Sequence, residues 1–258
     1  MPELPEVEAA RKQLAKAAEG KTIARLRLLH PSLAKRITRA RLRGLQGRRI
    51  ERVERRGKHQ LLHLDDGRTL AIHFRMNGDW DIGTVGDAEP RFTRASLELE
   101  DGTRVALTDM RALSTVELFA KGEGDPVLGP EPSDPAFNAD TLGVALARRS
   151  GAIKPALLDQ RMVAGIGNIY AAEALWLAKI SPRAKAASLS AHRRERLIQA
   201  VRDVLSDAPA GRYWAKHEGS RWNVYDREGE KCPRCGATIR RIVQAGRSTF
   251  YCPVDQKS

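Results

Sequence analysis

The stretch Gly129-Pro130-Glu131-Pro132-Ser133-Asp134-Pro135 divides the 258-residue sequence into two parts of different texture. Proline lacks the backbone N–H that helices and sheets use, so this cluster of breakers interrupts any regular element. Short, alternating segments precede the stretch, and alanine- and leucine-rich segments follow it. The stretch therefore predicts a domain boundary, and the change of texture across it predicts an α+β protein.

The residues before the boundary predict one helix and an antiparallel sheet. Residues Glu6–Ala18 carry an apolar side chain at every third or fourth position, which is typical of an amphipathic helix. The segments that follow are short and β-branched or alternating, and turn signals such as Asp101-Gly102 separate them. The expected strands are Ile50–Val53, Gln60–Leu64, Thr69–Phe74, Ala95–Leu99 and Arg104–Leu107.

The residues after the boundary predict helices and then a return to β structure. The β character resumes at about Trp222 and continues to the end of the sequence. The expected helices are Ala139–Arg149, Ile153–Leu158, Ile169–Leu177 and Ala191–Ala208.

Charge is the strongest compositional signal. The formal net charge is +13 and the isoelectric point is near 10.1. Between Arg11 and Lys58 there are 17 basic and three acidic residues. A merely solvated surface usually mixes the two signs, so this imbalance favours a surface that binds a polyanion. At 41% hydrophobic and 30% charged residues, the composition excludes a disordered tail or a collagen-like fibre.

Features at the two ends of the sequence, and the lack of a long apolar run between them, predict the cellular location of the protein. The amino terminus, Met1–Glu8, is acidic and lacks the basic start and apolar stretch of a secretory signal. No apolar run approaches the roughly 20 residues that cross a bilayer. The odd number of cysteines, clustered near the carboxyl terminus, suits a metal better than disulfides. These features predict a cytoplasmic, intracellular protein that does not enter a membrane.

Pro2 is a candidate nucleophile. Removal of Met1 leaves a secondary amine, and α-amino groups have a pKa near 7.7–8.0, against about 10.4 for lysine. Such an amine can attack a sugar C1′ atom, and the adjacent Glu3 can move protons. The alternative is a frayed terminus without function.

Residues Gly165–Tyr170, Gly-Ile-Gly-Asn-Ile-Tyr, predict a turn that opens a helix. Small residues there let backbone N–H groups approach a phosphate. The stretch lacks the third glycine and the preceding strand of a dinucleotide fingerprint, which excludes that interpretation. A tight turn between helices, without a ligand, is the alternative.

Cys232-Pro233-Arg234-Cys235 precedes Cys252-Pro253-Val254-Asp255 by sixteen residues. Two such knuckles are typical of a zinc ribbon, with Asp255 in the place of a fourth cysteine. A carboxylate can ligate zinc, and His217 is a possible substitute. The alternative is a hairpin without metal, held by the packing of its apolar residues.

Met76 follows a predicted strand and lies outside any periodic apolar pattern. An unbranched side chain at a loop tip can enter a base stack where a nucleotide has been extruded. A methionine packed in the core is the alternative.

Together these motifs resemble the formamidopyrimidine-DNA glycosylase and endonuclease VIII family of base-excision repair enzymes. The resemblance spans nearly the whole chain, and Leu4-Pro5 is similar to the purine-directed branch. It is carried by Pro2–Glu6, Arg56–Lys58, Leu128–Pro132, Lys154 with Gly165–Tyr170, and Gln244–Cys252.

The resemblance implies three domains. Residues 1–132 would form a two-layer β-sandwich with flanking helices, the catalytic domain. Residues 133–215 would form a helix-two-turn-helix DNA-binding domain, and residues 216–258 a zinc-ribbon-like β-hairpin with one structural zinc ion. Double-stranded damaged DNA would be the partner of a monomeric, nucleoid-associated protein.

The resemblance also implies roles for individual residues. Pro2 would displace the damaged base and form a Schiff base with C1′, and Glu3 would serve as general acid and base. Lys58 would contact a phosphate and carry protons near the lesion. Asn168 and Arg247 would hold the phosphates beside the everted nucleotide, with Lys154 and Tyr170 supporting them. The catalytic set is thus Pro2, Glu3, Lys58 and Arg247, the DNA-binding set Met76, Arg111, Leu113, Lys154, Asn168 and Tyr170, and the metal set Cys232, Cys235, Cys252 and Asp255.

The sequence departs from the family pattern in three places. After Asp109 the family usually has Pro-Arg-Arg-Phe-Gly, whereas this chain keeps Arg111 but has Ala112 and Leu113 next. Leu113 would offer less stacking area as a wedge. The segment 210–231 is short for the loop that covers everted 8-oxoguanine in the purine-directed enzymes, and Asp255 replaces a cysteine.

The resemblance thus implies a bifunctional DNA glycosylase and AP lyase that removes oxidised bases, ring-opened or oxidised purines first, and cuts by β,δ-elimination. A non-catalytic relative that binds damaged DNA is the main alternative. An RNA-binding zinc-ribbon protein would explain the charge and the cysteines, but neither the amino terminus nor Gly165–Tyr170.

Overall fold

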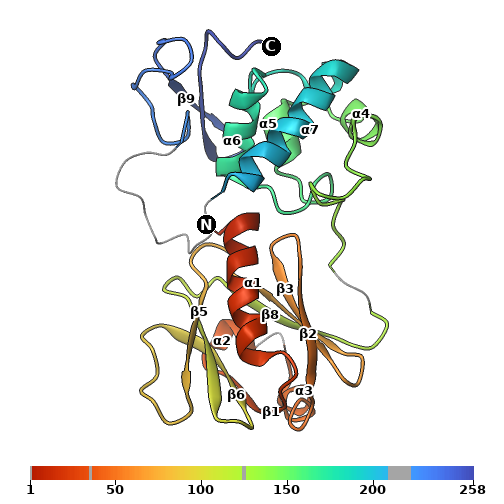
Figure 1. The fold of residues 1–258 in the computed structure, drawn as a ribbon, viewed down its shortest axis with the longest axis vertical. Coiled ribbons are helices and arrows are strands. Elements are labelled where there is room, and N and C mark those ends of the chain that lie inside the picture. Colours follow the sequence, from red (N-terminus) through yellow and green to blue (C-terminus); the bar gives the residue numbers. More distant parts are fainter. Residues whose placement is uncertain (1, 35–36, 124–125, 209–221) are drawn as a thin grey trace. The chain divides into compact units, whose positions relative to one another are not determined.

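The structure, a computed structural model, describes residues 2–34, 37–123, 126–208 and 222–258. The described residues fall into two compact units, one up to Pro126 and the other from Val127 onward. Figure 1 shows both units, each of which is described by itself. The predicted division into three domains, at residues 132 and 215, stays a prediction.

The first unit holds two four-stranded antiparallel sheets, with strand orders β1-β6-β7-β5 and β2-β3-β4-β8. One cluster of buried apolar side chains contains residues from both sheets, so the sheets pack as two layers around a shared core. The α+β fold and its two-layer sandwich are thereby confirmed. The strands are β1 (Ile23–Leu28), β2 (Ile50–Arg56), β3 (His59–Leu64), β4 (Thr69–His73), β5 (Asp79–Thr84), β6 (Thr93–Leu99), β7 (Thr103–Thr108) and β8 (Thr115–Phe119).

Strands β1, β5 and β8 were not among the predicted strands. Each lies at the edge of its sheet, where one side of the strand has no neighbour. One residue of six is buried in β1 and one of six in β5, whereas three of the five residues of β8 are buried. A strand that buries few residues, or one as short as β8, carries a weak pattern in the sequence.

Helix α1 (Leu4–Ala18) packs on the sandwich and is the helix predicted for residues 6–18. Its buried residues are Val7, Ala10, Leu14, Ala17 and Ala18. The basic segment that follows forms the short helices α2 (Pro31–Ala34) and α3 (Arg39–Arg43) beside β1.

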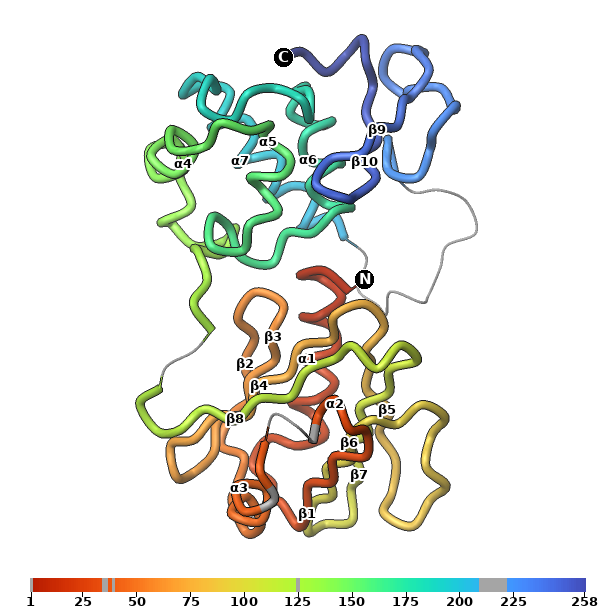
Figure 2. Tube along the Cα trace, turned by 180° about the vertical axis from the view of Figure 1, so that it is seen from behind, coloured from red at the N-terminus to blue at the C-terminus, as the bar shows by residue number. Residues whose placement is uncertain are grey.

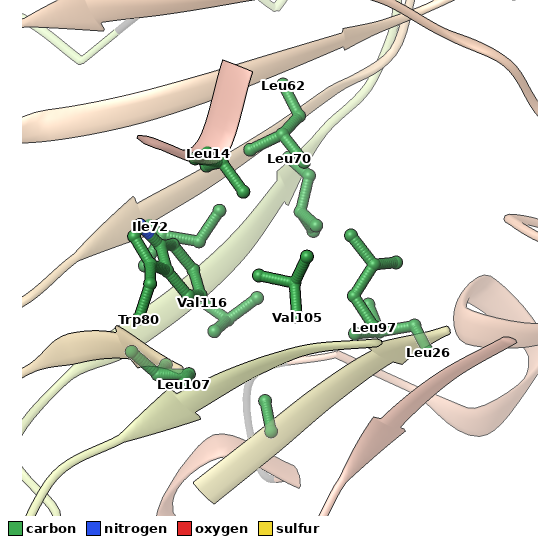
Figure 3. Close-up of a pocket in the computed structure, with 11 residues that line it drawn as sticks. Leu14, Leu26, Leu62, Leu70, Ile72, Trp80, Leu97, Val105, Leu107 and Val116 are labelled. Atoms are coloured by element: carbon green, nitrogen blue, oxygen red, sulfur yellow. The ribbon is translucent and has the colours of Figure 1, made fainter. Parts of the chain in front are cut away.

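A cavity of about 20 Å³ lies between the two layers of the sandwich. Figure 3 shows that apolar side chains line it, among them Leu14, Trp80 and Val105. Its volume is close to that of one water molecule, and water needs polar partners that this lining does not offer. It is a packing void of the core and no ligand site.

The strand register brings several connections to one end of the sandwich. His59 pairs with His73, and His73 pairs with Thr115. The β2–β3 turn, the loop after β4 and the loop before β8 therefore leave the same end of their sheet. The start of α1 lies at this end as well, because the Glu8 carboxylate accepts a hydrogen bond of 3.0 Å from Arg55 Nε at the end of β2. Figures 1 and 2 show the first turn of α1 beside the β2–β3 turn.

The second unit is helical and ends in a β-hairpin. Two clusters of buried apolar residues form its core, one among the helices and one between α6 and the hairpin region. The four predicted helices are all present, within two residues of their expected ends. The elements are α4 (Ala139–Ala147), α5 (Ile153–Leu157), α6 (Asn168–Leu177), a 3₁₀ turn η1 (Ala186–Ser188), α7 (Ala191–Ser206), β9 (Arg240–Gln244) and β10 (Arg247–Tyr251).

Among the described residues, no helix combines the length and the apolar character that a membrane span requires.

A pair of histidines at the loop-bearing end of the sandwich makes stability depend on pH. The rings of His59 and His73 lie edge to face with centroids 4.7 Å apart. The pKa of His73 is lowered to about 3, mainly by burial and then by the charges of His59, Arg75 and Lys58. Burial also lowers the pKa of His59. His73 Nδ1 accepts the Arg75 N–H at 2.9 Å, as a neutral imidazole can.

We therefore expect the free energy of unfolding to decrease as the pH falls from 6.5 towards 3. In that window the unfolded chain binds a proton at His73 and the folded chain does not. One such proton corresponds to a slope of up to about 1.4 kcal/mol per pH unit. Urea unfolding at pH 7, 6, 5 and 4 measures the slope, which His73→Asn should reduce. His192→Asn, at an exposed position of α7, is the matched control. An unchanged slope in His73→Asn would contradict this assignment.

Candidate functional site

The amino terminus is held in place. Pro2 and Glu3 are both buried, and Glu3 is 1% exposed. Glu3 is the N-cap residue of α1, and the Glu6 carboxylate accepts the Glu3 backbone N–H at 2.9 Å. Pro5 lies in the first turn of α1, where proline is compatible with a helix because the backbone N–H groups of the first turn have no partner within the helix. The alternative of a frayed terminus does not fit residues 2 and 3.

Lys58 lies in the β2–β3 turn at the same end of the unit and is 6% exposed. Gly57 precedes it with a φ of +58°, a conformation that suits glycine. Arg55 joins this turn to α1, because its Nη1 donates to the Gly57 carbonyl at 3.0 Å while its Nε donates to Glu8. The ion pair thus fixes the turn that carries Lys58 beside the beginning of α1.

Met76 lies in the loop between β4 and β5 and is 36% exposed, so it is not a core methionine. The loop is compact at Gly78, where a Cβ atom would lie 2.7 Å from atoms of Phe74 and Ser114. Ser114 Oγ also lies 3.1 Å from the Phe74 carbonyl oxygen. The Met76 loop and the loop before β8 are therefore joined at their bases.

The loop Asp109–Ser114 is built around one buried carboxylate. Asp109 Oδ1 accepts the Arg111 N–H at 3.0 Å, and Oδ2 accepts the N–H groups of Leu113 and Ser114, both at 2.7 Å. From outside, Arg94 donates to the carbonyls of Asp109 and Met110. Several hydrogen bonds to an ionised acceptor make a rigid loop.

This loop projects three side chains into solvent. Arg111 is exposed, Leu113 is 43% exposed and Met110 is 60% exposed. Ala112 between them has a φ of +52°, which turns the backbone and directs its neighbours outward. The Arg111 guanidinium thus lies between two exposed apolar side chains, in a unit with an excess of basic residues. Such a combination is suited to contact with stacked bases.

In the second unit, Lys154 is buried in α5 and its ammonium group has three acceptors. Nζ lies 2.7 Å from Asn168 Oδ1, 2.8 Å from Thr249 Oγ1 and 3.2 Å from the Ser248 carbonyl. Asn168 Nδ2 donates to the same carbonyl at 3.0 Å. Three acceptors use all the donors of an ammonium group. Lys154 therefore joins α5, the start of α6 and the hairpin, and is placed to support the site rather than to contact a phosphate.

Tyr170, in α6, is buried like Lys154. It is 1% exposed and packs edge to face against Trp222, with ring centroids 5.6 Å apart. The supporting role in DNA binding that the resemblance implies for Lys154 and Tyr170 stays a prediction, and the burial of both side chains is consistent with it.

The turn before α6 is preset by Gln160. Its Oε1 accepts the Gly165 N–H at 3.0 Å, and its Nε2 donates to the Ile166 carbonyl at 2.9 Å. Gly165 has a φ of +89°. The first backbone N–H groups of α6, at Asn168 and beyond, are thereby held at a defined helix start, where an anion is favoured.

Arg247 begins β10 and is exposed. The two-residue turn before it, Ala245-Gly246, has positive φ at both positions, the geometry of a tight hairpin. Arg240 and Arg241 on the paired strand are exposed as well. The hairpin thus carries three arginines, as a phosphate-binding surface requires.

Three of the four predicted metal ligands lie close together, and the fourth does not join them. The Sγ atoms of Cys232, Cys235 and Cys252 all lie within 4.8 Å of one another. Thiolates bound to zinc lie about 2.3 Å from the ion, so all three fit around one ion. The Asp255 carboxylate instead forms an ion pair with Arg234. Asp255 as the fourth ligand stays a prediction, and His217 lies outside the described residues.

Glu173 was missed in the sequence. It is 1% exposed on the otherwise apolar helix α6, and its carboxylate accepts the N–H groups of Asn223, Val224 and Tyr225 at 2.8–2.9 Å. It fixes the segment that leads to the hairpin. A lone acid within Ile169–Leu177 was the signal that could have revealed it, since buried charges require partners.

The fold and these residues define a protein with a basic amino-terminal β-sandwich, a helical unit and a cysteine-bearing hairpin. Family models match in the same order. The formamidopyrimidine-DNA glycosylase N-terminal domain matches residues 1–116, the H2TH domain of the same enzymes residues 128–213, and the "zinc finger found in FPG and IleRS" residues 229–257.

Curated relatives match over the full length. The formamidopyrimidine-DNA glycosylase of Chloroflexus aurantiacus is 41% identical over 99% of this chain and 98% of its own length. That of Ruegeria pomeroyi is 39% identical over 100% of both. The chain belongs to the formamidopyrimidine-DNA glycosylase family, which confirms the resemblance.

Solved structures of formamidopyrimidine-DNA glycosylases have a similar fold over the whole chain. The Lactococcus lactis formamidopyrimidine-DNA glycosylase, bound non-covalently to DNA with an AP site, has a TM-score of 0.91 and 32% identity, with 100% of each chain covered. The same enzyme in complex with DNA that contains Fapy-dG has a TM-score of 0.90 and 32% identity, over 99% of this chain and 100% of that one. The zinc-finger match and the three cysteines support a structural zinc ion in this chain.

Replacement of Lys154 by methionine should lower the free energy of unfolding by about 1–3 kcal/mol, because it leaves buried acceptors on Asn168 and Thr249 without their donor. Urea unfolding measures the loss. Lys185→Met, at an exposed position, is the control and should change stability little. Equal stability of the two variants would refute the proposed network.

Proposed function

We propose that this protein is a bifunctional DNA glycosylase and AP lyase that removes oxidised purines from double-stranded DNA. The observation that carries the proposal is the buried, helix-anchored pair Pro2-Glu3 at the loop-bearing end of the sandwich. Family membership supports the activity. A protein that only binds DNA needs neither a free amine nor an acid beside it.

The chemistry begins at the Pro2 nitrogen, once Met1 has been removed. Its lone pair attacks C1′ of the damaged nucleotide, the N-glycosidic bond breaks, and the base leaves with its bonding electrons and takes up the proton that the Pro2 nitrogen loses. Glu3 protonates the sugar ring oxygen as the ring opens, and the product is an iminium, the Schiff base. Loss of a C2′ proton then expels the 3′ phosphate, and a second elimination expels the 5′ phosphate.

The residues that share the end of the sandwich with Pro2 have roles in holding the substrate. Lys58 binds a phosphate next to the lesion and carries protons. Met76 and Leu113 fill the space that an extruded base leaves in the stack, and Arg111 reaches the base opposite. The rigid Asp109 loop sets these side chains before DNA arrives, which lowers the entropy cost of binding.

The second unit binds the backbone of the DNA. Arg247 and Asn168 with the start of α6 contact the phosphates beside the everted nucleotide, and Lys154 and Tyr170 hold them in place. The zinc ion is held by the hairpin cysteines and supplies a structural cross-link. A monomeric state, a cytoplasmic, nucleoid-associated location and the absence of membrane contact are part of this proposal.

Borohydride trapping on duplex DNA with one abasic site tests the proposal. Protein whose intact mass shows that Met1 is absent should form a covalent complex that maps to Pro2. Pro2→Gly should change the yield of the covalent complex and the rate at which it forms. Glu3→Gln should reduce strand cleavage. Tight binding of the same DNA without a covalent complex would instead assign the non-catalytic, damage-binding function.

Replacement of Leu113 by alanine should separate base extrusion from lyase chemistry. We expect excision of an oxidised purine from duplex DNA to slow by about tenfold, equivalent to about 1.4 kcal/mol, because the wedge is lost. Cleavage at a preformed abasic site should change less. Single-turnover kinetics on both substrates measure this. Val85→Ala removes an exposed apolar side chain at the other end of the sandwich and should leave both rates unchanged.

A further inference from the structure

The zinc site of this chain has three thiolates and an aspartate in the fourth position of the motif. Among the described residues, no His, Asp or Glu joins the cluster formed by Cys232, Cys235 and Cys252. Cys232 and Cys252 are buried, whereas Cys235 is exposed. One side of the cluster is therefore open to solvent.

The Asp255 carboxylate is held elsewhere. It accepts from Arg234 Nη1, and the same nitrogen donates to the Trp176 carbonyl at 3.1 Å. The guanidinium group also stacks on the Trp176 ring, 3.9 Å from the centroid. Trp176 Nε1 lies 3.5 Å from Cys232 Sγ. Arg234 thus has a fixed position between helix α6 and the carboxylate.

The backbone of Asp255 has a different role from its side chain. Its N–H donates to Cys252 Sγ at 3.4 Å. Next to it, Gln256 accepts the Cys252 N–H at 2.7 Å and donates to the Ile180 carbonyl at 2.9 Å. The second knuckle is therefore fixed to the helical unit by hydrogen bonds, without a fourth metal ligand.

We propose that Asp255 is not a metal ligand, and that its ion pair with Arg234 cross-links the two knuckles where a fourth metal–thiolate bond would otherwise do so. The metal is then bound by three thiolates, none of the described residues supplies its fourth ligand, and we assign that position to a small external donor such as water, a thiol or an imidazole. An ion pair that is largely shielded and stacked on an aromatic ring resists separation better than an exposed one. This inference does not depend on the proposed DNA chemistry.

Cobalt(II) binding to the reduced full-length chain tests the coordination, because its visible spectrum reports the ligand set and thiolate charge-transfer bands report the number of thiolates. Asp255→Asn should leave the spectrum unchanged and weaken cobalt binding by no more than the 10–100-fold, roughly, that loss of a supporting contact costs. Cys235→Ser should weaken binding by more. Asp255→Cys should add a thiolate band and tighten binding.

Added imidazole distinguishes an open position from a filled one. It should shift the cobalt spectrum of the wild type and of Asp255→Asn, but not that of Asp255→Cys. The proposal is overturned if Asp255→Asn alters the cobalt spectrum, since loss of a ligand changes the ligand set whereas loss of a supporting contact lowers the affinity alone. Failure of the wild type to bind cobalt would overturn it as well.

A double-mutant cycle tests the ion pair in the zinc-loaded protein. Arg234→Gln and Asp255→Asn should each lower the melting temperature, and the double variant should lower it by less than the sum of the two. Gln retains a donor for the Trp176 carbonyl, so the cycle isolates the charge pair. Additive effects would show that Arg234 and Asp255 do not act together.

Discussion

The buried ammonium group of Lys154 organises the second unit, because a charge removed from water must find hydrogen-bond partners there. Its three acceptors come from the start of α6 and from β10. The helices and the hairpin must therefore take positions that bring these acceptors to the Lys154 ammonium group. Glu173 imposes the same requirement on the segment before the hairpin. In the first unit, the Asp109 carboxylate does so for a loop.

These buried charges explain how irregular segments become suitable for binding. A loop of six residues has many conformations in isolation, and ordering it on contact with DNA would reduce affinity. Asp109, Arg94 and Ser114 impose one conformation in advance. Loss of the Asp109 carboxylate would leave the buried Ser114 N–H without its acceptor, which costs more than the hydrogen bond contributes.

The chain departs from its family's sequence pattern at places with a local structural explanation. Leu113 retains an exposed apolar side chain where the family usually has an aromatic residue, on a loop whose backbone is fully supported. Asp255 retains the N–H that contacts a cysteine sulfur and directs its side chain to Arg234. In both places the contacts that hold the backbone come from backbone N–H groups, which do not depend on the side chain at that position.

The sequence by itself determined the elements whose pattern is local: α1 from its apolar spacing, the central strands from alternation, the helices after Gly129–Pro135, and the three cysteines from their spacing. It also indicated Pro2-Glu3 and the family. Only the tertiary structure decided what depends on distant pairing. The edge strands β1, β5 and β8 exist because a neighbour binds them, and the register of His59, His73 and Thr115 brings the Lys58, Met76 and Leu113 segments to one end. The partners of Lys154 and Asp255 lie 14 to 95 and 21 residues away in sequence, and no local pattern records a contact over such separations.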